Sequence, residues 1–309
     1  MTLASPPHRT LATLTAASKR YGPVLALDAV NLQVRAGEVL AVLGANGAGK
    51  TTALGLLTGR LSADAGSARL FGADPRDPAV RRGIGVMLQD GDLPDTLRVA
   101  EHVRLFSSYY PSPRPVDQTL ALAGLTDLAR RPYGALSGGQ KRRVEFALAI
   151  CGRPPLLFVD EPTVGLDVEA RRNFWAVLRQ LREEGAGIVL TTHYLEEADA
   201  LADRIVLMAG GRVLAEDTPG GIKARAAGKR LRAKTTLSPE LLRAWPGVRS
   251  LVMDQGVTEL LTGDAEPVLR RWLAADPSLS GLEVRPLSLE EAFLTLTSAP
   301  AAASMESAA

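Results

Sequence analysis

The sequence contains one cysteine, Cys151, among 309 residues, and this scarcity excludes two kinds of scaffold. A single thiol cannot form an internal disulfide, and it cannot supply the cysteine cluster of a zinc site. We therefore expect a protein of a reducing compartment in which Cys151 packs as a small apolar side chain.

Long apolar runs and a charge of one sign are missing as well. No run approaches the roughly 20 apolar residues of a membrane span, and residues 1–10 lack the basic region and apolar core of a secretory signal. Lys and Arg number 36 against 34 Asp and Glu, which gives no strong attraction to nucleic acid or anionic lipid. We expect no nucleic-acid partner, and any membrane role should depend on a partner chain.

One motif is present in full. Residues 44–51 read GANGAGKT and fit G-x-x-x-x-G-K-[ST], the phosphate-binding loop. An apolar run at 39–43 precedes the motif as an expected buried strand, and residues 52–57 follow it as the start of a helix. Strand, glycine loop and helix are the context that this motif requires.

The residue types of this loop suit a polyphosphate. Glycines let successive backbone N–H groups point inward at phosphate oxygens, and the helix N-terminus adds partial positive charge. Lys50 is expected to reach the outer phosphates, and the Thr51 hydroxyl to ligate Mg²⁺. The residues expected to line the phosphates are Gly44, Ala45, Asn46, Gly47, Ala48, Gly49, Lys50, Thr51 and Thr52.

Two adjacent carboxylates, Asp160 and Glu161, follow the apolar run at 156–159. Neighbouring residues of a strand point to opposite sides, so the two carboxylates need not share a role. We expect Asp160 to hold Mg²⁺ and Glu161 to orient and deprotonate an attacking water. The alternative is an acidic pair at a helix N-terminus, for which Pro162 leaves room.

Residues 136–140 (LSGGQ) precede a basic amphipathic helix expected over 141–150. Ser137 and Gln140 form a capping box, while the two glycines between them expose free N–H groups that could bind a second anion. A nucleotide needs only one such helix end from its own subunit. The pattern therefore suggests two chains that enclose two nucleotides.

Strands and helices alternate through the middle of the chain, which predicts a parallel sheet. The strands before the phosphate loop predict an antiparallel flap, and a helical insertion is expected over 93–132, broken near 109–115. The expected strands are 11–16, 24–27, 30–34, 39–43, 84–88, 156–159, 188–192 and 204–208; the expected helices include 168–184 and 195–202.

The last third of the chain has a different pattern. Beyond residue 228 the predicted order is strand, helix, strand, strand, helix, strand, which is that of a small α+β ferredoxin-like domain, and Ser288 with Glu291 caps a final helix. The predicted domains are a flexible arm at 1–10, a nucleotide-binding domain at 11–218 with a helical subdomain at about 93–150, a linker at 219–228, the α+β domain at 229–298 and a disordered tail at 299–309.

These motifs together resemble the ATP-binding cassette family of transporter ATPases. The resemblance rests on residues 136–140 lying shortly before residues 156–162 (LLFVDEP), and it covers about residues 11–218. It implies an α/β fold of the P-loop NTPase type, ATP and Mg²⁺ as ligands, and hydrolysis of ATP to ADP and phosphate.

The resemblance also implies roles for single residues. Tyr21 resembles the aromatic residue that stacks on adenine, Gln89 the glutamine that senses Mg²⁺ and contacts the membrane partner, and His193 the switch histidine at the γ-phosphate. Asp167 resembles a residue at the dimer seam. The turn that would contact ATP bound to the opposite subunit comprises Ser137, Gly138, Gly139 and Gln140.

Two further stretches narrow the resemblance. Residues 161–167 with 170–172, and the ending at 287–297, are similar to stand-alone cassettes of bacterial drug- and antibiotic-resistance exporters. This implies a homodimer that closes head-to-tail around two MgATP. It would drive export of a drug-like or other hydrophobic substrate through a separate permease, at the cytoplasmic face of the cell membrane.

Other interpretations stay open at the level of sequence. Tyr21 could be an ordinary turn aromatic, Gln89 a polar strand end, His193 a satisfied histidine at a strand exit, and Asp167 a simple helix cap. One alternative function is that of a non-transport cassette, which would act in translation, DNA repair or chromosome function. Another is that of a GTPase or small-molecule kinase, but neither would have a use for residues 136–140. The C-terminal domain could sense a ligand, although dimer support or docking to the permease is favoured.

Overall fold

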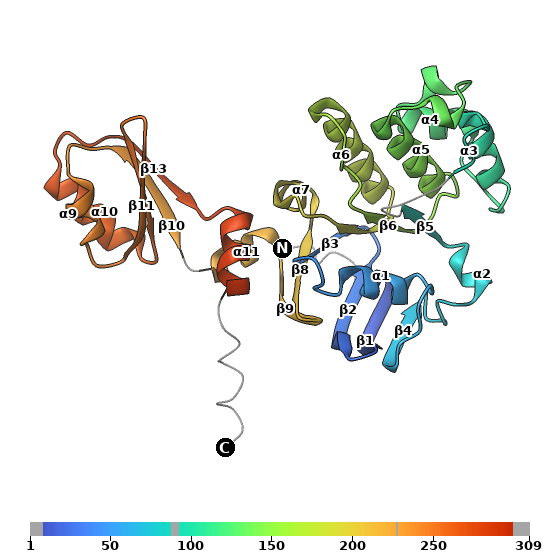
Figure 1. Ribbon diagram of the computed structural model, residues 1–309, viewed down its shortest axis with the longest axis horizontal. Helices are drawn as coiled ribbons and strands as arrows, with labels where there is room; N and C mark the ends of the chain where they lie inside the picture. The colour runs from blue at the N-terminus through green and yellow to red at the C-terminus, as the bar shows by residue number, and fades with distance from the viewer. Residues whose placement is uncertain (1–8, 88–92, 227, 299–309) are drawn as a thin grey trace, which may run out of the picture. The chain divides into compact units, whose positions relative to one another are not determined.

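The computed structural model describes residues 9–87, 93–226 and 228–298. The chain divides into two compact units between Glu216 and Asp217 (Figure 1). Each unit is described by itself.

A six-stranded sheet forms the centre of the first unit. Neighbouring strands from β5 through β6, β7 and β3 to β8 run parallel, and β9 completes the order β5-β6-β7-β3-β8-β9. All five residues are buried in each of β3, β6 and β7, which explains why these strands appear as unbroken apolar runs. The strands are β3 (Val39–Leu43), β5 (Ile84–Met87), β6 (Leu156–Asp160), β7 (Gly187–Thr191), β8 (Arg204–Ala209) and β9 (Arg212–Asp217).

Helices cover both faces of this sheet. In Figure 1, α1 lies on one side of the strands and α5 and α6 on the other. Side chains alternate accordingly, because Leu157 and Val159 belong to the core beneath α5 and α6 whereas Phe158 belongs to the core beneath α1. The helices are α1 (Lys50–Leu57), α5 (Gly138–Ile150), α6 (Val168–Glu183) and α7 (Leu195–Leu201).

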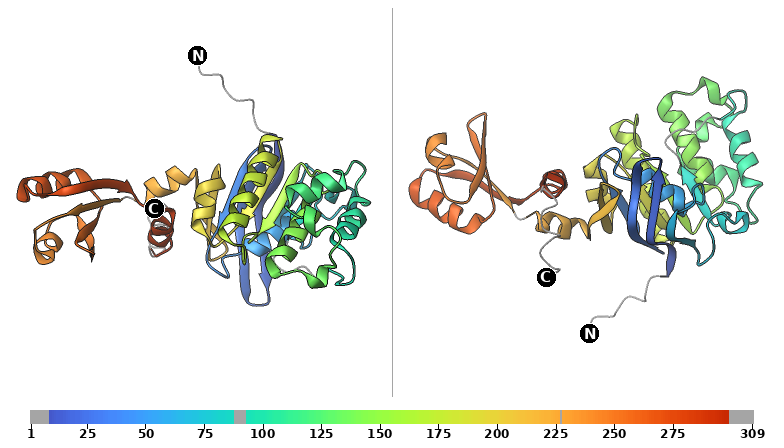
Figure 2. Two further views of the ribbon diagram at one scale, coloured as in Figure 1. Left: turned by 90° about the horizontal axis from the view of Figure 1, so that it is seen from above. Right: turned by 60° about the horizontal axis from the view of Figure 1, so that its bottom comes forward.

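The expected antiparallel flap is a three-stranded sheet of order β2-β1-β4, built from β1 (Thr10–Tyr21), β2 (Val24–Arg35) and β4 (Ala65–Leu70). The flap lies beside α1 in all views (Figure 1, Figure 2). The two strands predicted at 24–27 and 30–34 are one continuous strand, in which Ala29 has a φ of 48°. The strands β4 and β9 and the short helix α2 (Pro78–Arg81) are not predicted by the sequence analysis.

The helical insertion consists of α3 (Val99–Ser107), α4 (Val116–Leu122) and two 3-10 turns, Thr126–Leu128 and Tyr133–Ala135, before α5 begins. The break between α3 and α4 falls at the prolines of residues 111–115, as predicted. Val103, Leu120 and Leu125 are buried in the same core as α5.

The second unit contains a four-stranded antiparallel sheet of order β11-β12-β10-β13. Trp245 and Trp272 pack with Leu231 and Leu260 in its core. Its elements are α8 (Pro219–Arg225), β10 (Lys229–Lys234), α9 (Pro239–Arg243), β11 (Val248–Asp254), β12 (Val257–Thr262), α10 (Ala265–Ala275), β13 (Ser280–Pro286) and α11 (Leu289–Ser298).

Most of the predicted linker at 219–228 is helical. Residues 219–225 form α8, because the Thr218 hydroxyl accepts a hydrogen bond from the Gly221 N–H at 3.1 Å and Pro219 suits the first helical position. The two glycines that suggested a linker lie in the first turn, where the helix tolerates them. The predicted arm at 1–10 is one residue too long, because Thr10 already pairs with Arg35 as the first residue of β1. Residues 1–8 of the arm and the predicted tail at 299–309 lie outside the described residues.

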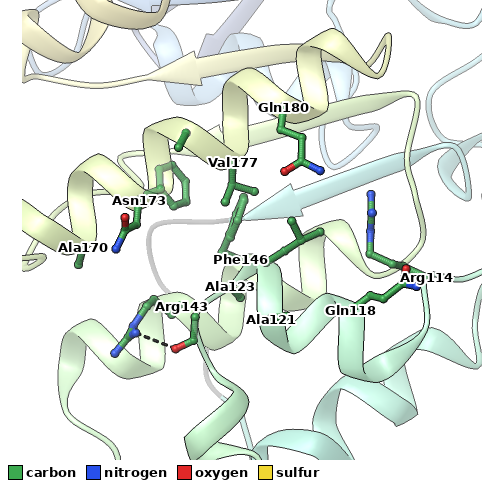
Figure 3. A pocket seen from close by; sticks show the side chains of 14 residues that line it. Arg114, Gln118, Ala121, Ala123, Arg143, Phe146, Ala170, Asn173, Val177 and Gln180 are labelled. Atoms are coloured by element: carbon green, nitrogen blue, oxygen red, sulfur yellow. Dashed lines mark hydrogen bonds between the residues drawn. The ribbon is translucent and has the colours of Figure 1, made fainter.

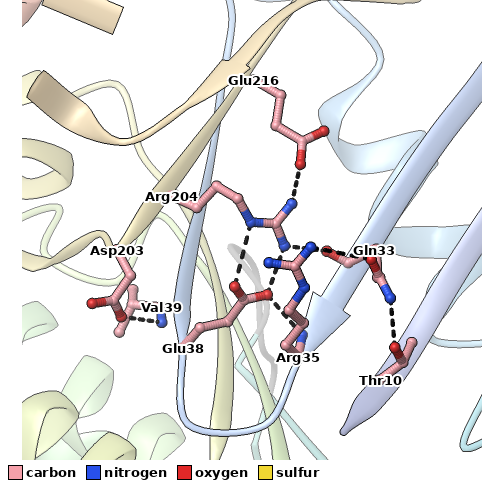
Figure 4. Close-up of polar contacts among 8 residues, drawn as sticks. All are labelled: Thr10, Gln33, Arg35, Glu38, Val39, Asp203, Arg204 and Glu216. Atoms are coloured by element: carbon pink, nitrogen blue, oxygen red, sulfur yellow. Dashed lines mark hydrogen bonds and ion pairs between the residues drawn. The ribbon is translucent and has the colours of Figure 1, made fainter. Parts of the chain in front are cut away.

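A buried ion pair joins the flap to the edge of the central sheet (Figure 4). The Arg204 guanidinium donates to Glu38 at 2.7 Å, to the carbonyl of Gln33 and to Glu216. The Glu38 carboxylate also accepts the Arg35 N–H at 2.7 Å. Glu38 is 6% exposed, so its charge depends on these partners.

Replacing Glu38 by Ala should lower the free energy of unfolding by about 3–5 kcal/mol, because Arg204 would keep its buried charge without its main partner. The matched control is Asp28→Ala, which breaks the exposed pair between Asp28 and Arg212 and should cost less than about 1 kcal/mol. Urea unfolding followed by circular dichroism measures both. Equal losses of unfolding free energy in the two variants would show that the buried Glu38 pair contributes no more to stability than the exposed Asp28 pair.

Candidate functional site

The predicted phosphate loop, carboxylates and histidine all follow strands of the parallel sheet. The loop follows β3, Asp160 ends β6, and His193 comes two residues after β7. Because β3, β6 and β7 are parallel neighbours, their carboxyl ends meet at one edge of the sheet. This arrangement brings together residues that are up to 149 positions apart, from Gly44 to His193.

Backbone geometry explains the glycines of the phosphate loop. Gly49 has a φ of 103°, and a Cβ there would lie 2.6 Å from the carbonyl oxygen of Ala26. At Gly44 a Cβ would lie 2.5 Å from the carbonyl oxygen of Met208. No side chain caps the N-terminus of α1, so its first N–H groups are available to an anion.

Lys50 is folded back onto this loop. Its Nζ donates to the carbonyl oxygens of Gly44 at 2.6 Å and Ala45 at 3.1 Å. Burial lowers the pKa of Lys50, and the negative charges of Glu161 and Asp160 partly oppose that effect. The lysine is therefore within electrostatic reach of both predicted carboxylates.

The two carboxylates have different surroundings, as their alternation along the strand predicts. Asp160 is buried and accepts a hydrogen bond from the Thr191 hydroxyl. Glu161 follows the strand with a φ of 47°, a left-handed conformation that is costly for a residue with a side chain. Its Oε2 lies 2.8 Å from Nδ1 of His193. The Glu161 carboxylate therefore contacts the histidine, whereas that of Asp160 contacts Thr191.

Sequence reasoning missed the residue that holds this turn. Arg142 of α5 is 8% exposed, and its Nη2 donates to the carbonyl oxygens of Asp160 and, at 3.0 Å, of Glu161. Nη1 donates to Glu145 at 2.6 Å. The sequence predicts only a basic amphipathic helix over 141–150, and the one signal for Arg142 is a charged residue on the buried face of that helix.

A second missed residue is Glu197 of α7, which is fully buried. Its carboxylate accepts from Trp175 Nε1 at 3.0 Å and from the Thr163 hydroxyl at 3.4 Å. Burial raises the pKa of Glu197, and these hydrogen bonds oppose the shift. The contacts link α7, which follows His193, to α6 and to the segment that follows Glu161.

The Ser137 turn and Asp167 line a common hollow of about 690 Å³ together with Glu161. The capping box is formed, with Ser137 N–H donating to the Gln140 side chain at 3.0 Å and Gln140 N–H to Ser137 Oγ at 3.3 Å. Asp167 caps α6 by accepting the Ala170 N–H at 2.8 Å. Both local capping interpretations are therefore confirmed.

The remaining predicted site residues are exposed or half-buried, except for Gln89, which lies outside the described part of the chain. Tyr21 is 46% exposed at the β1–β2 hairpin, with Lys19 Nζ 5.9 Å from its ring centroid. Thr51 is exposed and Thr52 half-buried at the start of α1.

Comparison with known sequences gives one family. The family described as ABC transporter matches residues 27–164. The daunorubicin/doxorubicin resistance ATP-binding protein DrrA of Streptomyces peucetius is 38% identical over 301 residues, covering 92% of this chain and 91% of that protein. The Nod factor export ATP-binding protein I of Rhizobium sp. (strain N33) is 36% identical and covers 92% of this chain and 96% of its own.

Solved structures agree with this family. An ATP-binding subunit of an ABC transporter aligns with a TM-score of 0.65 and 28% identity, covering 70% of this chain and 93% of its own. A dimeric post-hydrolysis cassette bound to ADP and phosphate aligns with a TM-score of 0.62 and 27% identity, covering 67% of this chain and 98% of its own. With its mixed α/β fold and parallel sheet, the chain belongs to the ABC transporter family, as an ATP-binding and ATP-hydrolysing subunit.

Proposed function

We propose that the contact between Glu161 and His193, beside Lys50, is the hydrolytic centre of this ATPase. The observation that carries the proposal is the 2.8 Å distance between Glu161 Oε2 and His193 Nδ1 at the edge of the sheet that also presents the phosphate loop. A carboxylate in that position has a fixed orientation and lies close to a group that can bind the γ-phosphate.

Each residue then has a distinct task in the in-line attack of water on the γ-phosphorus. The N–H groups of residues 44–52 and the Lys50 ammonium bind the phosphates and offset their charge. Glu161 orients the water and accepts its proton as the bond to the ADP oxygen breaks. His193 holds Glu161 through Nδ1 and presents its other ring nitrogen to the γ-phosphate.

A Mg²⁺ ion suits the oxygen atoms at this edge. Asp160 provides a buried carboxylate that is already oriented by Thr191, and Thr51 provides an exposed hydroxyl at the start of α1. Hard oxygen donors of this kind, completed by phosphate and water, are what Mg²⁺ binds. Gln89 is the third proposed ligand. Bound there, the ion would offset charge on the outer phosphates.

Two copies of the chain would close head-to-tail around two MgATP. Ser137, Gly138, Gly139 and Gln140 would then contact the nucleotide held by the partner, and Asp167 would lie at the seam. A Cβ on Gly138 would meet no atom within 4 Å, so this turn has room for a ligand. Tyr21 would stack on adenine at the outer rim.

The cargo would be a drug-like or other hydrophobic molecule, exported through a separate permease at the cytoplasmic face of the membrane. The printed names of the relatives support this, since they refer to daunorubicin and doxorubicin resistance and to Nod factor export. Within the described residues, none of the helices has the length and apolar character needed to cross a bilayer. Association with the membrane would therefore be peripheral, through the permease.

The second unit would support the dimer or dock the permease. The connectivity of β10, α9, β11, β12, α10 and β13 with the strand order β11-β12-β10-β13 supports a ferredoxin-like domain at 229–298, in addition to the cassette domain at 11–218. The division of the chain at Glu216 supports its independence of the nucleotide site.

Replacing Glu161 by Gln should reduce ATP hydrolysis about 100-fold or more, because the amide cannot accept the proton from water. ATP binding should persist, and the dimer should accumulate with MgATP. The matched control is Glu196→Gln, an exposed glutamate of α7, which should keep the wild-type rate. Phosphate release and sedimentation measure these effects. A wild-type rate in the Glu161 variant would disprove its role as the base.

Ending the chain after Glu216 should leave nucleotide binding within about threefold of wild type, because no residue of the proposed site lies in the second unit. Dimer formation or binding to the permease should weaken. Titration with a fluorescent ATP analogue and sedimentation measure the two properties. Loss of nucleotide binding by the folded truncated protein would place part of the site in the second unit.

A further inference from the structure

A separate pocket of about 640 Å³ lies between α4, α5 and α6 of the first unit (Figure 3). Phe146 of α5 and Phe174 of α6 meet there with ring centroids 4.4 Å apart. The remaining apolar lining is aliphatic and comes from Ala121, Leu122, Ala123, Ala170, Ala176 and Val177. The volume is in the usual range for a site that takes a drug-sized molecule.

Arg114 and Arg143 are the charged residues that line this pocket in the described part of the chain. Arg114 is paired with the Glu184 carboxylate, which lies next to the pocket. Each arginine uses one nitrogen elsewhere, Arg114 on Glu184 at 3.3 Å and Arg143 on the Gly124 carbonyl at 2.8 Å. In both, the buried Nε has no hydrogen-bond partner, which is costly for a charged group.

Two glutamines also lie near the aromatic pair, and the amide of Gln180 donates to Glu184 at 2.9 Å. Figure 3 shows Arg143 and Arg114 on opposite sides of Phe146, with Gln118 beside Arg114 and Gln180 above. An acidic group at Arg143 would gain a charge-assisted hydrogen bond, whereas one at Arg114 would compete with Glu184. Flat rings would lie on the aromatic and aliphatic floor.

We propose that this pocket binds a small aromatic anion, such as an aromatic carboxylate or sulfonate, with its rings against Phe146 and Phe174 and its acid group at Arg143. A helical peptide is a poorer fit, because two turns of helix about 10 Å wide and about 11 Å long exceed the pocket volume. The arginine thus selects a negatively charged ligand, and the aromatic and aliphatic side chains select one with flat rings.

Binding here should change the ATPase rate, an inference that rests on the proposed function. Arg143 and Ala170 line both this pocket and the hollow that contains Ser137 and Asp167. The pocket walls are the helices that begin at those two turns, α5 and α6. A ligand that bridges α5 and α6 would alter the spacing of the turns that are proposed to meet the partner's nucleotide.

The test uses the full-length protein without nucleotide and two fluorescent probes of matched ring structure, anilinonaphthalene sulfonate and the uncharged phenylnaphthylamine. We expect the sulfonate to bind at least about tenfold more tightly, and Arg143→Gln to weaken it at least about tenfold while leaving the neutral probe unchanged. Val177→Trp, which fills the pocket, should weaken both probes. Arg179→Gln on α6, whose side chain donates to the Ala200 carbonyl, is the control and should change neither.

Equal affinity for the two probes, or sulfonate binding unchanged by Val177→Trp in a protein that melts like wild type, would overturn the site. A second measurement follows ATP hydrolysis with saturating sulfonate, where at least about a twofold change is expected in wild type and none in Val177→Trp. Sulfonate binding without any change in rate would contradict the coupling alone. The binding assay needs no ATP hydrolysis. Its result therefore stands even if Glu161 and His193 prove not to be the hydrolytic centre.

Discussion

The pairing of β6 with β7 is the constraint on which the proposed hydrolytic centre depends. Asp160 lies opposite Thr191, and the Glu161 N–H donates to the Thr191 carbonyl at 3.0 Å. Arg142 holds the carbonyls of both acidic residues from α5. These contacts compensate for the left-handed backbone at Glu161, and they fix the direction in which its side chain leaves the sheet.

The two glycine-containing helix starts of the first unit differ in a way that fits different tasks. The N-terminus of α1 has no side-chain cap, so its N–H groups depend on another partner, whereas Ser137 and Gln140 already satisfy part of the first turn of α5. A site that holds phosphate throughout the cycle benefits from unsatisfied donors. A turn that meets nucleotide only when two chains close must also be stable when they are apart, and the capping box provides that stability.

Much of this site could be predicted because its motifs are local. The phosphate loop, the Asp160–Glu161 pair and the Ser137 capping box each fit within eight residues, and the strands that carry them are unbroken apolar runs. Arg142 and Glu197 could not be predicted, because their partners lie 18 and 34 residues away in sequence. The α8 helix was missed because glycines suggested a break, although Thr218 and Pro219 set the helix start. The pocket at Phe146 depends on how three helices pack, which no local pattern records.

We propose that each nucleotide is held by the phosphate loop of one chain and the Ser137 turn of the other. The most direct measurement mixes two inactive variants, Lys50→Ala and Ser137→Arg, and follows phosphate release. In a mixed dimer one site has both defects and the other has none, so an equal mixture should recover up to about a quarter of the wild-type rate if the sites act independently. A mixture as inactive as either variant alone, although mixed dimers form, would contradict the account.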